Sequence, residues 1–171
     1  LKKLVTAAVC TMLMATVAFT AGCGGEKKSD KKVLKVGMEC AYAPYNWSQT
    51  KADGGAVKIA GSNEYAYGYD VMMAKKLADS MGADLEIQKI EWDGLAPAVV
   101  SGKIDAAIAG MSITSKRKET VDFTKPYYYA TVVALVKKDS EQAKAQSVAD
   151  LKGSVATSQL NTIWYDQIDQ V

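Results

Sequence analysis

Strand-like runs alternate with helical patterns along most of this chain, and that alternation limits the fold more than any other feature. Residues 33–38 (VLKVGM) and 85–92 read as strands, and residues 69–81 place apolar side chains at helical spacing before Gly82. Residues 104–110 (IDAAIAG) form a near-continuous apolar run, which is typical of a strand buried on both faces of a parallel sheet. The alternation predicts βαβ units and therefore an α/β fold with a parallel sheet.

The remaining segments carry weaker signals. Asp70 lies near a helix start, where a carboxylate meets free amides, and Thr114 and Ser115 are candidate helix caps. We expect a polar loop or hairpin outside the core at 48–66, helices at 93–101, 112–119 and 147–151, strands at 131–136 and 155–157, and a further helix from Asn161.

The first 22 residues are typical of a signal peptide. Lys2 and Lys3 precede an uncharged run, and small residues then precede Cys23. The run is also about long enough for a transmembrane helix, which is the alternative interpretation. Residues 20–23 (TAGC) resemble a bacterial lipobox, whose cysteine becomes the lipidated first residue. We therefore expect residues 1–22 to be a signal peptide and 23–32 a flexible, lipidated tether that anchors the protein to the membrane from the outside.

Composition excludes several functions. Residues 33–171 hold 15 basic and 17 acidic residues, so this part is not a basic nucleic-acid binder. The chain contains no histidine, which rules out Cys–His and Ser–His nucleophile pairs. Cys40 would be unpaired, and we interpret it as a small buried hydrophobe rather than a reactive thiol. We expect no cofactor and no metal site.

Polar and aromatic residues follow three of the expected strands. Ligands of open α/β sheets bind at the carboxyl ends of strands, where loops lead into helices. The loop after the first strand contains Glu39 and Tyr42, and the loop after residues 104–110 contains Gly110 and Ser112. The loop at 159–162 follows the expected strand at 155–157. We expect these loops to border one ligand site.

Arg117 is the only arginine beside 20 lysines. Its planar fork can bind a carboxylate with two hydrogen bonds, which lysine cannot reproduce. A surface salt bridge, for example with Asp122, is the alternative. Tyr42 and Trp92 could form aromatic walls of a cleft or pack in the core. Glu39 could bind a cationic group of a ligand or form an exposed salt bridge.

Five segments together resemble the polar amino-acid-binding proteins of bacterial ABC importers, solute-binding protein family 3. They are AYAPYNW (41–47), GYDV (68–71), residues 91–114, residues 115–128 and VADLKGSVATSQLNT (148–162). The resemblance implies a type II periplasmic-binding-protein-like fold with two lobes and a hinge. Lobe 1 would span 33–126, the hinge 127–131 and the start of lobe 2 132–171. The family's second lobe continues past this point, so we expect lobe 2 to be incomplete and the chain to be truncated at its C-terminus.

The resemblance also implies an anion site. Arg117 would bind the α-carboxylate of the substrate, with the backbone amides of Ser112 and the Thr162 region completing the site. Gly110 and Ser112 would surround the α-amino group. Asn161 stands where the family often has glycine, and asparagine tolerates left-handed backbone geometry.

Further roles follow from the same resemblance. Tyr42 and Trp92 would enclose the substrate side chain, Glu39 would face its far end, and Gln159 would approach it from lobe 2. Three aspartates match positions that we interpret as structural caps: Asp70, Asp105 and Asp122.

The function implied is that of an extracytoplasmic solute-binding lipoprotein, not an enzyme. It would capture a free amino acid, polar or basic, by hinge closure and deliver it to an ABC-transporter permease. One alternative is an enzyme on the same fold, of the periplasmic dehydratase or wall-cleaving type. Another is a sensory lipoprotein.

Overall fold

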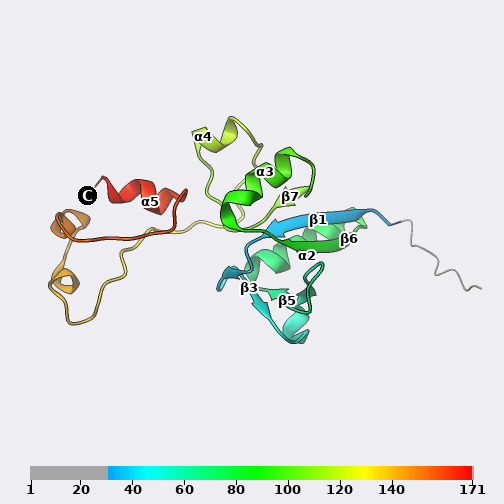
Figure 1. Ribbon diagram of the computed structural model, residues 1–171, viewed down its shortest axis with the longest axis horizontal. Helices are drawn as coiled ribbons and strands as arrows, with labels where there is room; N and C mark the ends of the chain where they lie inside the picture. Colours follow the sequence, from blue (N-terminus) through cyan, green and yellow to red (C-terminus); the bar gives the residue numbers. More distant parts are fainter. Residues whose placement is uncertain (1–30, 171) are drawn as a thin grey trace, which may run out of the picture. The chain divides into compact units, whose positions relative to one another are not determined.

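The computed structural model describes residues 31–170 (Figure 1). The predicted signal peptide, Cys23 and residues 24–30 of the predicted tether lie outside the described residues. In the part that is described, no helix has the length and apolar character needed to cross a membrane.

A parallel three-stranded sheet forms the centre of the structure. Its strand order is β6 (Asp84–Lys89), β1 (Val33–Met38) and β7 (Ala106–Ala107), and Val36 of β1 lies opposite Ile87 on one side and Ala106 on the other. Leu34, Val36 and Met38 are buried because β1 is the central strand. The predicted α/β fold with a parallel sheet is therefore confirmed.

A second, antiparallel sheet follows β1. It has the order β2 (Ala41–Tyr42), β3 (Asn46–Gln49), β5 (Tyr65–Tyr67) and β4 (Val57–Lys58), with a 3₁₀ turn η1 (Asp53–Gly55) between β3 and β4. The expectation that residues 48–66 lie outside the core is wrong, since Ile59 is 1% exposed and Ala66 is fully buried. Ile59 bridges Ile87 of the parallel sheet, so apolar residues within a mostly polar run reach the core.

Helix α2 (Tyr69–Met81) has the predicted bounds and ends at Gly82, whose φ is 62°. Val71, Ala74 and Ala78 face the core. Asp70, expected to cap this helix, makes no cap hydrogen bond to it. Its buried carboxylate accepts hydrogen bonds from two side chains instead, which corrects that expectation.

The segment after β6 contains short helices. The turn η2 (Trp92–Gly94) leads into α3 (Leu95–Val100), and α4 (Ser115–Lys118) is one turn long. The predicted cap Thr114 is confirmed, because its Oγ1 accepts from the Arg117 amide at 3.2 Å.

Residues 104–110 were expected to form a strand buried on both faces, and the structure differs. Only Ala106 and Ala107 pair with β1, and both are half-buried. Among the described residues β7 lies at the edge of its sheet, which leaves Ala106 and Ala107 partly exposed. Ile104 and Ala109, which precede and follow β7 in the sequence, are buried.

The chain from residue 131 onward holds few regular elements. They are η3 (Glu141–Lys144), η4 (Val148–Leu151) and α5 (Ile163–Ile168), and the predicted strands at 131–136 and 155–157 are absent. A strand needs a neighbour for its backbone amides and carbonyls, and neither segment pairs with any described residue. Residues 127–131, expected to be the hinge, are irregular, and their role stays a prediction.

Candidate ligand-binding site

The loops after β1 and β7 lie against each other. The two strands are parallel neighbours, so their carboxyl ends reach the same edge of the sheet. Gly110 has a φ of 62°, and a Cβ atom placed on it would lie 3.2 Å from Cε1 of Tyr42. Glycine is the residue that adopts this backbone geometry without strain and leaves room for the Tyr42 ring.

Both outer nitrogens of the Arg117 guanidinium are hydrogen-bonded to backbone carbonyls. Nη1 donates to the Ser112 oxygen at 2.7 Å, and Nη2 donates to the Asn161 oxygen at 2.9 Å. Among residues 31–170, Arg117 forms no salt bridge with Asp122. Burial lowers the pKa of Arg117, an effect that the nearby Asp166 carboxylate opposes.

The Asn161 carbonyl oxygen connects Arg117 to Trp92, and we refer to Arg117, Trp92, Asp93 and Asn161 as the Arg117 cluster. This oxygen also accepts a hydrogen bond from Nε1 of Trp92 at 3.1 Å, while the Asn161 side-chain amide donates to Asp93 at 2.9 Å. Asn161 has a φ of 59°, as its match to a family glycine suggested. Neither the contacts of the Asn161 carbonyl nor the role of Asp93 could be predicted from the sequence, because both depend on where a distant loop lies.

Glu39 and Gln159 are in direct contact. The Gln159 amide donates to the Glu39 carboxylate at 2.9 Å, joining the loop after β1 to the loop before α5. Thr162 is 2% exposed and caps α5, since its Oγ1 accepts from the Tyr165 amide and donates to the Gln159 carbonyl. The Thr162 hydroxyl therefore holds the turn that presents Gln159.

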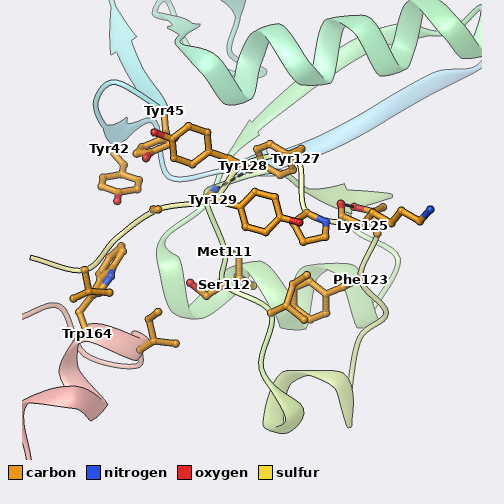
Figure 2. A pocket seen from close by; sticks show the side chains of 17 residues that line it. Tyr42, Tyr45, Met111, Ser112, Phe123, Lys125, Tyr127, Tyr128, Tyr129 and Trp164 are labelled. Atoms are coloured by element: carbon orange, nitrogen blue, oxygen red, sulfur yellow. Dashed lines mark hydrogen bonds between the residues drawn. The ribbon is translucent and has the colours of Figure 1, made fainter. Parts of the chain in front are cut away.

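A cavity of about 280 Å³ lies beside this cluster, and Figure 2 shows its side chains. Of the predicted site residues, Tyr42, Gly110 and Ser112 line it, whereas Arg117, Trp92, Glu39, Gln159 and Thr162 do not. Seven of its 17 lining residues are aromatic: Tyr42, Tyr45, Phe123, Tyr127, Tyr128, Tyr129 and Trp164.

The aromatic partner of Tyr42 differs from the one expected. Its ring stacks on Tyr45 at a centroid distance of 4.9 Å and lies 5.9 Å from Trp164. Figure 2 shows Tyr42 and Trp164 at one end of the cavity and Phe123 and Lys125 at the other. Trp92 lies with Arg117 instead. Sequence reasoning missed Trp164, which follows the expected helix start at Asn161.

No group of three or more cysteine, aspartate or glutamate side chains able to hold a metal occurs within residues 31–170. The arrangement is suited to binding a small polar molecule: the Arg117 guanidinium and the Glu39 carboxylate each contact the loop at 159–162, and aromatic rings line the cavity beside it. Hydrogen bonds and ring contacts of these kinds provide specificity in small-ligand sites.

Residues 34–171 match the family model of the bacterial extracellular solute-binding proteins, family 3. The arginine-binding extracellular protein ArtP of Bacillus subtilis (strain 168) is 33% identical over 94% of this chain and 56% of its own length. ABC transporter arginine-binding protein 1 of Escherichia coli (strain K12) is 32% identical over 90% of this chain and 52% of its own. The chain thus spans about half the length of the curated relatives it matches.

A solved structure supports the same relationship. The crystal structure of the ancestral amino acid-binding protein AncCDT-1, a precursor of cyclohexadienyl dehydratase, matches with a TM-score of 0.68 and 34% identity. The match covers 81% of this chain and 56% of that chain. The expected periplasmic-binding-protein-like fold class is confirmed, with this chain covering part of the fold. From the sequence match over most of its length, the chain belongs to the bacterial extracellular solute-binding proteins of family 3.

Proposed function

We propose that this protein captures a free amino acid outside the cytoplasm and delivers it to the permease of an ABC importer. The observation that carries the proposal is the state of Arg117, whose two outer nitrogens each donate to a carbonyl oxygen. A carboxylate presents two acceptor oxygens to the same fork and binds it more strongly, because the hydrogen bonds are then charge-assisted. On binding, the ligand carboxylate takes the place of the Asn161 carbonyl on Nη2.

The proposed ligand is a polar or basic amino acid, with arginine the first candidate. Glu39 provides an anionic group on the loop after β1, held by Gln159. A cationic side chain replaces the Gln159 amide as its partner at this point and adds charge complementarity. Two relatives are named as arginine-binding proteins, which agrees with this choice.

The remaining parts of the proposal concern binding by closure and attachment to the membrane. Residues 127–131 serve as a hinge, and ligand binding brings the loop at 159–162 and the loops of lobe 1 together around the amino acid. Closure makes and breaks no covalent bond. The lipidated Cys23 holds the protein at the outer face of the membrane, beside the permease.

An enzyme on the same fold is the second candidate, since AncCDT-1 is described as a precursor of cyclohexadienyl dehydratase. In this chain two carboxylates that contact the loop at 159–162 accept hydrogen bonds from side-chain amides: Glu39 from Gln159 and Asp93 from Asn161. The chain also contains no histidine, the side chain that most often serves as a general acid or base, and this favours binding over proton transfer.

A ligand panel tests the proposal. The Tm of the protein is measured in the presence of each of the 20 L-amino acids. Each amino acid that raises the Tm is then titrated into the protein by calorimetry. We expect arginine and other basic amino acids to raise the Tm, because ligands that bind the native state stabilise it. Stabilisation by no amino acid would refute capture, and conversion of a panel member into a product, detected by mass spectrometry, would establish the enzyme instead.

A further inference from the structure

Two left-handed backbone turns mark the loops after β1 and β7. Cys40 has a φ of 57° and Gly110 a φ of 62°. Each turn has its amide held by a side chain: the Cys40 N–H donates to Oδ1 of Asn46 at 2.8 Å, and the Gly110 N–H donates to the Tyr127 hydroxyl at 3.1 Å. Both loops that border the candidate site are thus fixed by side chains at their sharpest points.

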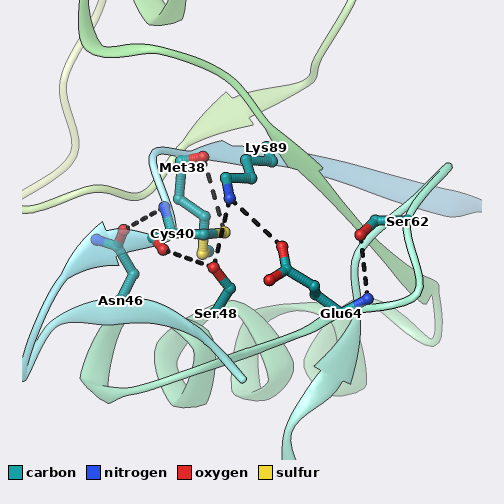
Figure 3. Close-up of polar contacts among 7 residues, drawn as sticks. All are labelled: Met38, Cys40, Asn46, Ser48, Ser62, Glu64 and Lys89. Carbon is teal, nitrogen blue, oxygen red and sulfur yellow. Dashed lines mark hydrogen bonds and ion pairs between the residues drawn. The ribbon is translucent and has the colours of Figure 1, made fainter. Parts of the chain in front are cut away.

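The two side chains meet at a single carboxylate. Asn46 donates through Nδ2 to Oδ2 of Asp70 at 2.7 Å, and the Tyr127 hydroxyl donates to Oδ1 of Asp70 at 2.7 Å. Asp70 and Asn46 are both fully buried. Figure 3 shows the Cys40 end of this chain of hydrogen bonds, and Figure 2 shows Tyr127 at the cavity.

Each link points the same way. From Cys40 and from Gly110 the donors run through Asn46 and Tyr127 toward the negative charge of Asp70, and hydrogen bonds aligned in this way polarise and strengthen one another. Among the described residues no buried side-chain nitrogen or oxygen lacks a partner. A fully satisfied buried network of this kind fixes one geometry.

We propose that Asp70 is a positioning residue, which sets the spacing of the two ligand-bordering loops through Asn46 and Tyr127. The inference rests on the proposed function, because it assigns these loops to the amino-acid site. Asp70 itself does not line the cavity. It acts by holding the Cys40 and Gly110 turns in place before the ligand arrives, and a prearranged site loses less entropy on binding.

Tyr127 connects this network to the proposed hinge, of which it is the first residue. Its ring stacks on Tyr69 at 6.1 Å, and the Tyr69 hydroxyl donates to the Tyr127 carbonyl at 3.1 Å. The beginning of the hinge and the Gly110 turn are therefore both attached to the first turn of α2. When the proposed hinge moves, the first turn of α2 therefore stays in place, and the residues after Tyr127 move relative to it.

The test uses Tyr127→Phe, which keeps the ring and removes the hydroxyl. We expect the Gly110 amide resonance to shift and its hydrogen exchange to accelerate at least about tenfold, because its acceptor is gone. Affinity for L-arginine, measured by calorimetry, should fall about tenfold. The matched control is Tyr67→Phe, whose ring packs edge-on against Trp47 at 5.1 Å; it should change neither quantity.

A second variant, Asp70→Asn, tests the junction. An amide offers one acceptor oxygen where the carboxylate offers two, so at least one link is lost and we expect faster exchange at Cys40, at Gly110 or at both. Unchanged exchange at Gly110 in Tyr127→Phe, or at both turns in Asp70→Asn, would overturn the proposal. So would arginine affinity in Tyr127→Phe equal to that of the control.

The two proposals fail separately. If the unaltered protein binds no amino acid, the proposed function is lost, and with it the ligand-positioning role of Asp70. If the unaltered protein binds arginine and Tyr127→Phe binds it equally well, the proposed function stands and only the role of Asp70 is lost.

Discussion

The Arg117 guanidinium lies over the indole ring of Trp92, with its central carbon 5.3 Å from the ring centroid. Nη2 of Arg117 and Nε1 of Trp92 donate to one oxygen, the carbonyl of Asn161. Arginine stacks on aromatic faces through its planar delocalised group, which fixes the plane of its donors. The fork is therefore oriented before any ligand binds.

Arg117→Lys should weaken the binding of L-arginine by about tenfold to a hundredfold, because lysine can neither form two parallel hydrogen bonds nor stack on Trp92 as a plane. Isothermal titration measures the change. Lys118→Arg, the reverse exchange at the neighbouring exposed position of α4, is the control and should bind normally. Equal affinity of Arg117→Lys and the unaltered protein would remove the carboxylate-binding role of Arg117.

Glu39→Gln should lower affinity for L-arginine about tenfold while changing affinity for L-glutamine much less, since only the cationic ligand loses a charge partner. The preference should also become less sensitive to salt. Competition titrations at two ionic strengths measure both effects. Glu91→Gln changes an exposed carboxylate and serves as the control. A parallel loss for both ligands would show that Glu39 has no part in selection.

Gly110→Ala should cost about 1 kcal/mol in the free energy of unfolding, because alanine is strained at positive φ. It should also weaken arginine binding, since the new Cβ lies 3.2 Å from the Tyr42 ring. Gly102→Ala separates the two effects: its φ is 71°, but a Cβ there meets open space. Urea unfolding should show a similar loss for both variants, whereas titration should show weaker binding for Gly110→Ala alone. Normal binding by both would contradict a role for the Tyr42–Gly110 contact.

Cys40 should resist alkylation in the folded protein. Burial raises the pKa of its thiol to about 11, with Lys89 acting in the opposite direction and Glu64 in the same one. At pH 8 about one thousandth of such a thiol is ionised, and the thiolate is the reactive form. Iodoacetamide followed by peptide mass spectrometry should find Cys40 unlabelled in buffer and labelled in urea. Equal labelling in both would show that the thiol is exposed.

The same shift predicts a dependence of stability on pH. The folded-state pKa of Cys40 lies above its ordinary value of 9.0, so its contribution to stability is fully present below pH 9 and is lost as pH rises through about 11. Urea unfolding of the unaltered protein and of Cys40→Ala across this range measures it. The difference between the two proteins should shrink toward pH 11, and a constant difference would contradict the shift.

How much of this structure the sequence predicts depends on the range of the interactions involved. The strand at 33–38 and the helix at 69–81 were predicted correctly, because their apolar spacing is local. Asp70 was interpreted as a cap from its position near a helix start, whereas its partners Asn46 and Tyr127 lie 24 and 57 residues away. A residue type at a helix start says nothing of groups so distant in sequence.

The candidate site shows the same division. The closeness of Tyr42 and Gly110 follows from the rule that parallel strands end at one edge, which the sequence could supply. The contact of Arg117 with the Asn161 carbonyl could not be predicted. Every residue has a backbone carbonyl, so the sequence does not show which one accepts a hydrogen bond. Trp164 was missed for a related reason: its place depends on where α5 lies.

The positions of the three tryptophans give the protein built-in optical probes. Trp92 contacts the Arg117 cation, Trp164 lies 5.9 Å from the Tyr42 ring, and Trp47 packs against Tyr67 in the antiparallel sheet. Under the proposed function, a ligand bound near Arg117 changes the surroundings of Trp92 and Trp164, and a variant that keeps only Trp47 serves as the reference. Emission spectra of single-tryptophan variants can therefore follow binding in real time without an attached dye.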